Sequence, residues 1–466
     1  KKFFLVPMMI NYMGVSLYGV WLIIGEAMAY IRNIEGGLGW AIEQKIASVK
    51  WKNDINKINI IYTNGLTVFL GLSLLAIIIG MSFAPFFTLL FKIDPEYDSL
   101  ITKVFFISVL TTGLGLPLIV IQSLLRGIQE QAKEVKINML NLIFSLILTI
   151  IVILLNLSII SLAFVGLFLL PFKYIYSIHV LKKKVKGLFF SFTMFSKKIS
   201  KELITISVFA FINQFSSLII FSTDAILIGR FIDTASVTIY ILTFQLILTL
   251  AGFAHSLATQ LQPGYAELTS QNNIKKISQI FLGTLKISMV FSSLIIPASY
   301  FINSHFVSFW VGENFFGGKD LTFIFSLIAF YTTLRQHCNA LLLSAGNLKF
   351  VAKWSFIEAV LNLVLSIILI QFLGLIGVAL GTLISGIILA IFLFIPKVLR
   401  KYNIPIFDIF SIVFLIPIFY SLPTFFFFWF ILKYVFINKS LLSIISFSFL
   451  GAIFGLMMIW LSLENK

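Results

Sequence analysis

Long apolar stretches separated by short polar segments make up most of the sequence. A helix that crosses the hydrocarbon core of a bilayer needs about 20 mostly apolar residues. Such stretches cover residues 18–40, 58–91, 100–125, 137–157, 159–181, 203–231, 237–262, 277–301, 321–345, 350–372, 374–396, 408–436 and 441–463. A shorter apolar stretch, Phe3–Met13, precedes them and fits the second half of a helix. The pattern therefore predicts an all-α polytopic membrane protein of about 14 transmembrane helices, the first one truncated.

Basic residues alternate between successive loops. One set of loops, together with the tail residue Lys466, holds 22 Lys and Arg residues, and the other set holds six. Short loops rich in Lys and Arg stay in the cytoplasm. A wrong division into spans would mix the two sets, so the alternation supports the helix assignment. It also predicts that both termini face the cytoplasm.

The composition excludes a soluble globular protein. Hydrophobic residues make up 59% of the chain and charged residues 11%, with a mean hydropathy of +1.05. The formal net charge of +16 would suggest nucleic acid in a soluble protein, but the excess lies in the cytoplasmic loops, and the charges within the spans sum to zero. The net charge therefore describes orientation and attraction to lipid, and it gives no reason to expect nucleic acid. The single cysteine, Cys338, permits no intramolecular disulfide.

An internal repeat divides the chain at a period of about 220 residues. Asn141-Leu-Ile-Phe-Ser-Leu-Ile-Leu148 matches Asn362-Leu-Val-Leu-Ser-Ile-Ile-Leu369, and Gly127 and Gly346 stand in the preceding loops. Six spans separate each element from its copy, so the repeat is parallel. The predicted domains are an N-terminal six-helix bundle (1–181, first helix partial), a basic cytoplasmic linker (182–202), a C-terminal six-helix bundle (203–400) and two additional transmembrane helices (401–466).

Several short motifs in this order resemble one superfamily of transporters. They are Gly14-x-x-x-Tyr18-Gly-Val-Trp21, Glu35-Gly-Gly-Leu-Gly39, Leu124-Leu-Arg-Gly-Ile-Gln129, Asp224-Ala-Ile-Leu-Ile-Gly229 with Val237-x-x-Tyr240, and Gly374-Leu-Ile-Gly-Val-Ala-Leu-Gly381. The chain resembles the MOP (MATE-like) superfamily, and within it the polysaccharide or O-antigen flippases. The family usually has an Asp-Leu-Gly-like turn where this sequence has Glu35-Gly-Gly-Leu-Gly39, and its first helix is complete.

The resemblance implies a transporter of the bacterial inner membrane. Undecaprenyl-pyrophosphate-linked oligosaccharide, an O-antigen or capsule repeat unit, would cross from the cytoplasmic to the outer leaflet by alternating access. Its implied partners are this glycan, membrane lipids and polysaccharide polymerase machinery, with the protein itself a monomer. The alternative is a MATE-like multidrug exporter coupled to protons or sodium ions.

The sequence contains no motif for an enzyme. It has no phosphate-binding Gly-x-x-x-x-Gly-Lys-[Ser/Thr] loop, no His-Glu-x-x-His and no Cys/His cluster. A membrane polymerase or glycosyltransferase would need a large outward catalytic loop, and the longest outer connection, about Asn303–Asp320, is short. We therefore expect no catalytic residue, no metal and no cofactor apart from a coupling H⁺ or Na⁺.

Cations within or beside the spans are the candidates for binding a pyrophosphate. They are Arg32, Lys286, Arg335 and Arg230. A guanidinium forks onto phosphate oxygens and stays charged. Simpler roles remain open: Arg32 can pair with Glu35 three residues on, and Arg230 can anchor at the interface.

Asp224, Glu26 and His255 are the candidates for binding a coupling ion. A charged group at the centre of a span costs about 2.5–3.5 kcal/mol on insertion scales, so each must face a cavity or a partner. Asp224 could equally be the structural partner of an Arg, and His255 a packing residue. Glu358 is expected to pair with Lys353 or Arg335 rather than to carry ions. Gly377-x-x-x-Gly381 is expected to mark close helix packing.

Overall fold

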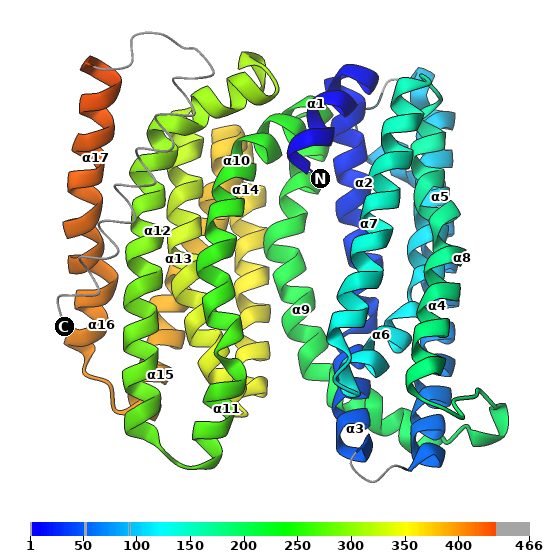
Figure 1. Ribbon diagram of the computed structural model, residues 1–466. Coiled ribbons are helices and arrows are strands. Elements are labelled where there is room, and N and C mark those ends of the chain that lie inside the picture. Colours follow the sequence, from blue (N-terminus) through cyan, green and yellow to red (C-terminus); the bar gives the residue numbers. More distant parts are fainter. Residues whose placement is uncertain (1, 51–53, 92, 94, 435–466) are drawn as a thin grey trace. The chain divides into compact units, whose positions relative to one another are not determined.

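The computed structural model describes residues 2–50, 54–91, 93 and 95–434 (Figure 1). Apart from short connections, these residues form helices, and ten stretches are long and apolar enough to cross a membrane. One of them, Leu348–Tyr402, contains two of the predicted spans. The predicted all-α membrane architecture is confirmed, and the last predicted span, residues 441–463, lies outside the described residues.

The chain divides into two compact units. Unit 1 consists of Lys1–Leu218 and Asp233–Ala235. Its helices are α1 (Lys2–Met13), α2 (Val15–Arg32), α3 (Leu38–Lys50), α4 (Ile55–Leu90), α5 (Asp98–Gly115), α6 (Leu118–Gly127), α7 (Gln131–Leu154), α8 (Ile159–Lys184) and the first part of α9 (Lys197–Phe231). In unit 1, α4 packs against α5, α3 against α6, and α8 against α5 and α7.

Unit 2 consists of Ile219–Ile232 and the chain from Ser236 onward. Its described helices are the end of α9, α10 (Thr234–Gln260), α11 (Gln262–Ser270), α12 (Ile274–Trp310), α13 (Lys319–Ser344), α14 (Leu348–Leu389), α15 (Ile395–Tyr402), α16 (Ile406–Phe410) and α17 (Ile416–Tyr434). Two π-helical turns, Ala390–Phe394 and Ser411–Leu415, interrupt the last part. Within this unit α12 packs against both α13 and α17.

Two predicted spans are broken helices. The span predicted at 18–40 covers α2, a 3-10 turn at Asn33–Glu35 and the start of α3. Gly36 and Gly37 adopt positive φ angles of 58° and 81°, which separate the 3-10 turn from α3. The span predicted at 100–125 becomes α5 and α6, interrupted between Gly115 and Leu118, where Pro117 cannot donate a helical hydrogen bond. Hydropathy predicts both spans correctly as apolar and gives no sign of the breaks.

Glycines also shape the turn within α14. Gly374 has a φ of +57° and separates the stretches predicted as two spans at 350–372 and 374–396. A Cβ at Gly377 would lie 2.2 Å from the Leu369 carbonyl oxygen, so only glycine permits this approach. The Asn362 amide then donates to Thr382 Oγ1 at 2.9 Å across the turn. The predicted close packing at the Gly-x-x-x-Gly motif is confirmed.

The segment between α8 and α9 is fastened to α4 by amide side chains. Asn64 Nδ2 donates to the Met194 carbonyl at 3.1 Å, and Asn64 Oδ1 accepts from Ser196 N at 2.8 Å. Asn59 makes the corresponding pair of bonds with Gly187 and Phe189, at 3.1 and 3.2 Å. Both asparagines are fully buried, so they replace water as the partners of this irregular backbone.

We predict that Asn64→Ala destabilises the protein by about 1–3 kcal/mol, because it leaves buried backbone groups without partners. The apparent midpoint of thermal unfolding of the purified protein in detergent should fall by several degrees. Asn56→Ala, at an exposed position of the same helix, is the control and should leave the midpoint unchanged. Equal midpoints for both variants would contradict the fastening role.

Candidate functional site

The break between α2 and α3 leaves a cation exposed. Arg32 ends α2, and the Glu35 carboxylate accepts a hydrogen bond from Gly39 N at 2.9 Å, in the first turn of α3. Glu35 therefore caps the positive end of α3. The alternative of an Arg32–Glu35 ion pair is not formed, and no ion pair among the described residues includes Arg32. Glu26, the other candidate on α2, is half-buried.

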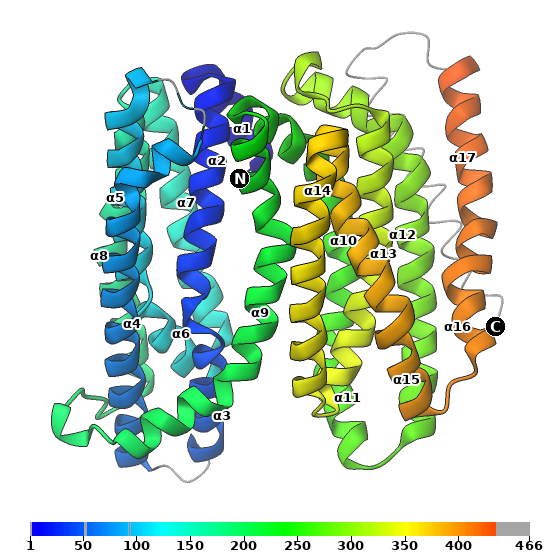
Figure 2. The ribbon, with the colours of Figure 1, turned by 180° about the vertical axis from the view of Figure 1, so that it is seen from behind.

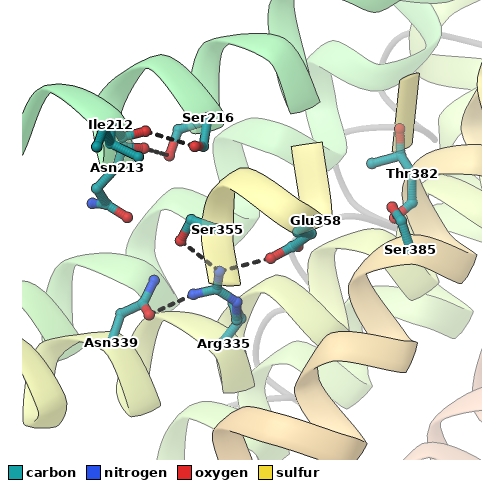
Figure 3. Close-up of polar contacts among 10 residues, drawn as sticks. Ile212, Asn213, Ser216, Arg335, Asn339, Ser355, Glu358, Thr382 and Ser385 are labelled. Atoms are coloured by element: carbon teal, nitrogen blue, oxygen red, sulfur yellow. Dashed lines mark hydrogen bonds and ion pairs between the residues drawn. The ribbon is translucent and has the colours of Figure 1, made fainter. Parts of the chain in front are cut away.

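A second polar cluster lies inside unit 2, between α13 and α14. Arg335 Nη2 donates to Glu358 Oε2 at 2.6 Å and to Ser355 Oγ at 3.0 Å, and Nη1 donates to Asn339 Oδ1 (Figure 3). Of the two partners expected for Glu358, the structure forms the one with Arg335. We call these four residues the Arg335 cluster.

Burial makes the Arg335 cluster electrostatically strong. The side chains of Arg335 and Glu358 are 9% and 3% exposed, so water screens their attraction little. The ring of Phe394, in the first π-helical turn, covers the guanidinium at 3.6 Å from its centroid, a cation–π contact. Arg335 Nε has no acceptor among the described residues. The cluster is neutral overall, and it joins α13, α14 and the π-helical turn.

Asp224 belongs to the same polar interior. Tyr240 Oη on α10 donates to Asp224 Oδ2 at 2.7 Å, and both side chains are buried. Tyr331 on α13 is also buried in unit 2, and its ring packs against Gly386 on α14. The end of α9 thus shares a buried polar region with α10, α13 and α14.

The predicted histidine has a neighbour that sequence reasoning missed. His337 on α13 is fully buried, with Nε2 2.9 Å from Ser288 Oγ on α12. His255 is half-buried, lies within electrostatic range of His337, and has no hydrogen-bond partner for Nε2 among the described residues. Of the remaining candidate cations, Lys286 is half-buried on α12 and Arg230 is exposed in the last turn of α9.

Some residues that contact the predicted site residues could have been found from their spacing in the sequence, and others could not. Asn339 follows Arg335 by four positions and Ser355 precedes Glu358 by three, spacings that place them on shared helix faces. No sequence pattern indicates that Tyr240 faces Asp224 or that Phe394 covers Arg335, because these contacts join different helices.

Removing one member of the Arg335 cluster should destabilise the protein more than removing two. Glu358→Leu leaves a buried guanidinium charge uncompensated, at a cost of about 3–5 kcal/mol, whereas Arg335→Leu with Glu358→Leu removes both charges. We expect the double variant to regain most of the thermal midpoint in detergent. A double variant no more stable than Glu358→Leu would show that the ion pair is not the source of the loss.

Comparison with known proteins identifies a matching family and solved structures of similar fold. A model of the family described as polysaccharide biosynthesis protein matches residues 2–269. No curated protein matches the chain.

Three solved structures are similar in fold. The lipid II flippase MurJ in an inward closed conformation has a TM-score of 0.72 and 19% identity, covering 98% of this chain and 95% of its own. An inward-facing multidrug resistance MATE family transporter of the MOP superfamily has a TM-score of 0.69 and 16% identity, with coverages of 85% and 93%. A MOP superfamily transporter from Pyrococcus furiosus has a TM-score of 0.60 and 15% identity, with coverages of 85% and 94%.

At these identities the likenesses show the fold alone, which this chain shares with the MATE family transporter and the lipid II flippase. The family match covers more than half of the chain. Together with the apolar spans, it establishes that the chain is a multi-pass membrane protein that belongs to the polysaccharide biosynthesis protein family.

Proposed function

We propose that the protein flips undecaprenyl-pyrophosphate-linked oligosaccharide, an O-antigen or capsule repeat unit, from the cytoplasmic to the outer leaflet of the bacterial inner membrane. Family membership supports a role in polysaccharide synthesis. The fold shared with a lipid II flippase supports movement of a lipid-linked substrate. Both termini are cytoplasmic in this proposal, and the working unit is a monomer that cooperates with polysaccharide polymerase machinery.

The exposed guanidinium of Arg32 is the observation that carries this proposal. A broken helix often presents its positive end to an anion, but here Glu35 already occupies the first turn of α3. Arg32 is therefore the group at this break that remains available for an anionic ligand. Its planar fork can make two charge-assisted hydrogen bonds to phosphate oxygens.

The other proposed anion-binding cations are Arg335, Lys286 and Arg230, and Arg335 is the least accessible to a ligand. Arg335 is held by Glu358 and Ser355, so an anion could bind it only by displacing a buried carboxylate, which is costly. Lys286 and Arg230 complete the proposed set of cavity cations. We propose Asp224, Glu26 and His255 as the groups that bind a coupling H⁺ or Na⁺. Among them Asp224 is buried and accepts a hydrogen bond of 2.7 Å from Tyr240 Oη.

We predict that Arg32→Ala lowers the amount of surface polysaccharide roughly ten- to hundredfold when the carrier limits synthesis. Loss of one hydrogen-bonded charge contact costs about 1.5–3 kcal/mol of binding. Arg32→Lys keeps the charge and should retain part of the activity. The measurement is surface polysaccharide in a strain that depends on this gene, with membrane levels of the protein checked by immunoblot.

Lys136→Ala, an exposed cation on α7, is the matched control and should leave surface polysaccharide unchanged. Normal polysaccharide with Arg32→Ala would refute the role of Arg32. Resistance to cationic dyes conferred by the unaltered protein, with no effect on polysaccharide, would instead favour a MATE-like exporter.

A further inference from the structure

Three phenylalanines stand exposed among the lysines of the linker, residues 182–202. Phe189, Phe192 and Phe195 expose 48%, 71% and 45% of their surface. They lie in the segment between the end of α8 and the start of α9, which packs against the first turns of α4. Figure 2 shows the linker at the lower edge of unit 1, followed by the first turns of α9, which run across the base of the unit.

The linker has a defined inner and outer side. Val185 and Leu188 are buried in the core of unit 1. Asn59 holds the backbone at Gly187, and Asn64 holds it at Met194. The ring of Phe192 makes an edge contact with Phe190, with centroids 4.8 Å apart. Phe190 packs against the core of unit 1, whereas Phe189, Phe192 and Phe195 remain exposed on the outer side of the linker.

The charge of the linker is strongly positive. It contains seven lysines, all of them exposed: Lys182, Lys183, Lys184, Lys186, Lys197, Lys198 and Lys201. Lys184 pairs with Glu130, and no ion pair among the described residues includes the other six. The one acid of the linker, Glu202, pairs with Lys45. The exposed lysines outnumber the one acid of the linker and so give it a net positive charge that attracts an anionic partner.

These features fit the boundary of a membrane better than open water. Segments that combine phenylalanines with lysines bury their rings at the boundary between headgroups and acyl chains, and clustered lysines are attracted to anionic lipids. A second copy of the chain would bring an equally basic linker against this one, which charge repulsion opposes. An anionic lipid surface satisfies both the rings and the lysines.

We propose that the linker docks on anionic phospholipid headgroups of the leaflet at the basic end of the protein, with Phe192 inserted among them. The consequence concerns α9. This helix begins at Lys197, inside the linker, so docking fixes the start of the helix that leads from unit 1 into unit 2. This proposal does not depend on the identity of the transported substrate.

The test measures how deeply position 192 lies in lipid. Phe192→Cys and Gln271→Cys, each combined with Cys338→Ala, are labelled with the environment-sensitive dye NBD in the otherwise intact protein. Gln271 is an exposed residue between α11 and α12 and serves as the matched position. In nanodiscs containing phosphatidylglycerol, doxyl-labelled lipids should quench NBD at position 192 about threefold more than at position 271.

The dependence of quenching on charge distinguishes binding to anionic lipid from a purely apolar contact with the membrane. Lys197→Gln with Lys198→Gln should remove about half of the extra quenching that phosphatidylglycerol produces over phosphatidylcholine alone. Lys133→Gln with Lys136→Gln, two exposed cations of α7, should leave it unchanged. Equal quenching at positions 192 and 271, or quenching indifferent to phosphatidylglycerol, would overturn the proposal. So would efficient disulfide crosslinking between two chains through position 192, which would identify a second copy as the occupant.

Discussion

The absence of water in the bilayer core is the constraint on which the rest of this structure depends. Every backbone N–H and C=O there needs a partner within the protein, and a continuous helix supplies one. Each departure from a helix must therefore bring its own partners. Glu35 supplies such a partner, an acceptor for the first turn of α3. At the end of the helices, outside the hydrocarbon core, Asn59 and Asn64 do the same for linker backbone that protein packing hides from water. The irregular segments are consequently the places where individual polar side chains matter most.

The same constraint sorts the charged side chains. Arg335 is tolerated inside unit 2 because Glu358 neutralises it and Phe394 covers its face. A buried pair of this kind adds little net stability over apolar packing, but it strongly penalises any arrangement that separates its members. The pair therefore fixes how α13 sits against α14. It accounts for two of the opposite charges that balance within the predicted spans.

The positions of the helices could be predicted from the sequence because hydropathy reports the length of each apolar stretch directly. The breaks could not, since hydropathy changes little around Pro117. The Arg32–Glu35 pair, one of the two roles left open for Arg32, assumed a continuous helix. Instead α2 ends at Arg32, residues 33–35 form a 3-10 turn, and the Glu35 carboxylate accepts from Gly39 N. The link between Asn64 and Met194 joins residues 130 positions apart, so no local spacing could indicate it. The sequence left Lys353 and Arg335 as possible partners of Glu358. The structure pairs Glu358 with Arg335, through a contact between α13 and α14 that no spacing within one helix could indicate.

The two best-placed arginines thus differ in what a ligand must do to reach them. An anion that approaches Arg335 competes with the Glu358 carboxylate, which lies 2.6 Å from the guanidinium. If the anion displaced this carboxylate, Glu358 would remain charged and unpaired in a low-dielectric interior. An anion that approaches Arg32 displaces only solvent, because the neighbouring carboxylate of Glu35 is engaged with α3. A carrier must release its cargo as well as bind it, so contacts that exchange with solvent suit it better than contacts that rebuild a buried network. For the proposed anionic lipid-linked cargo, Arg32 is accordingly the proposed point of contact, whereas the contacts of the Arg335 cluster hold α13 against α14 within unit 2.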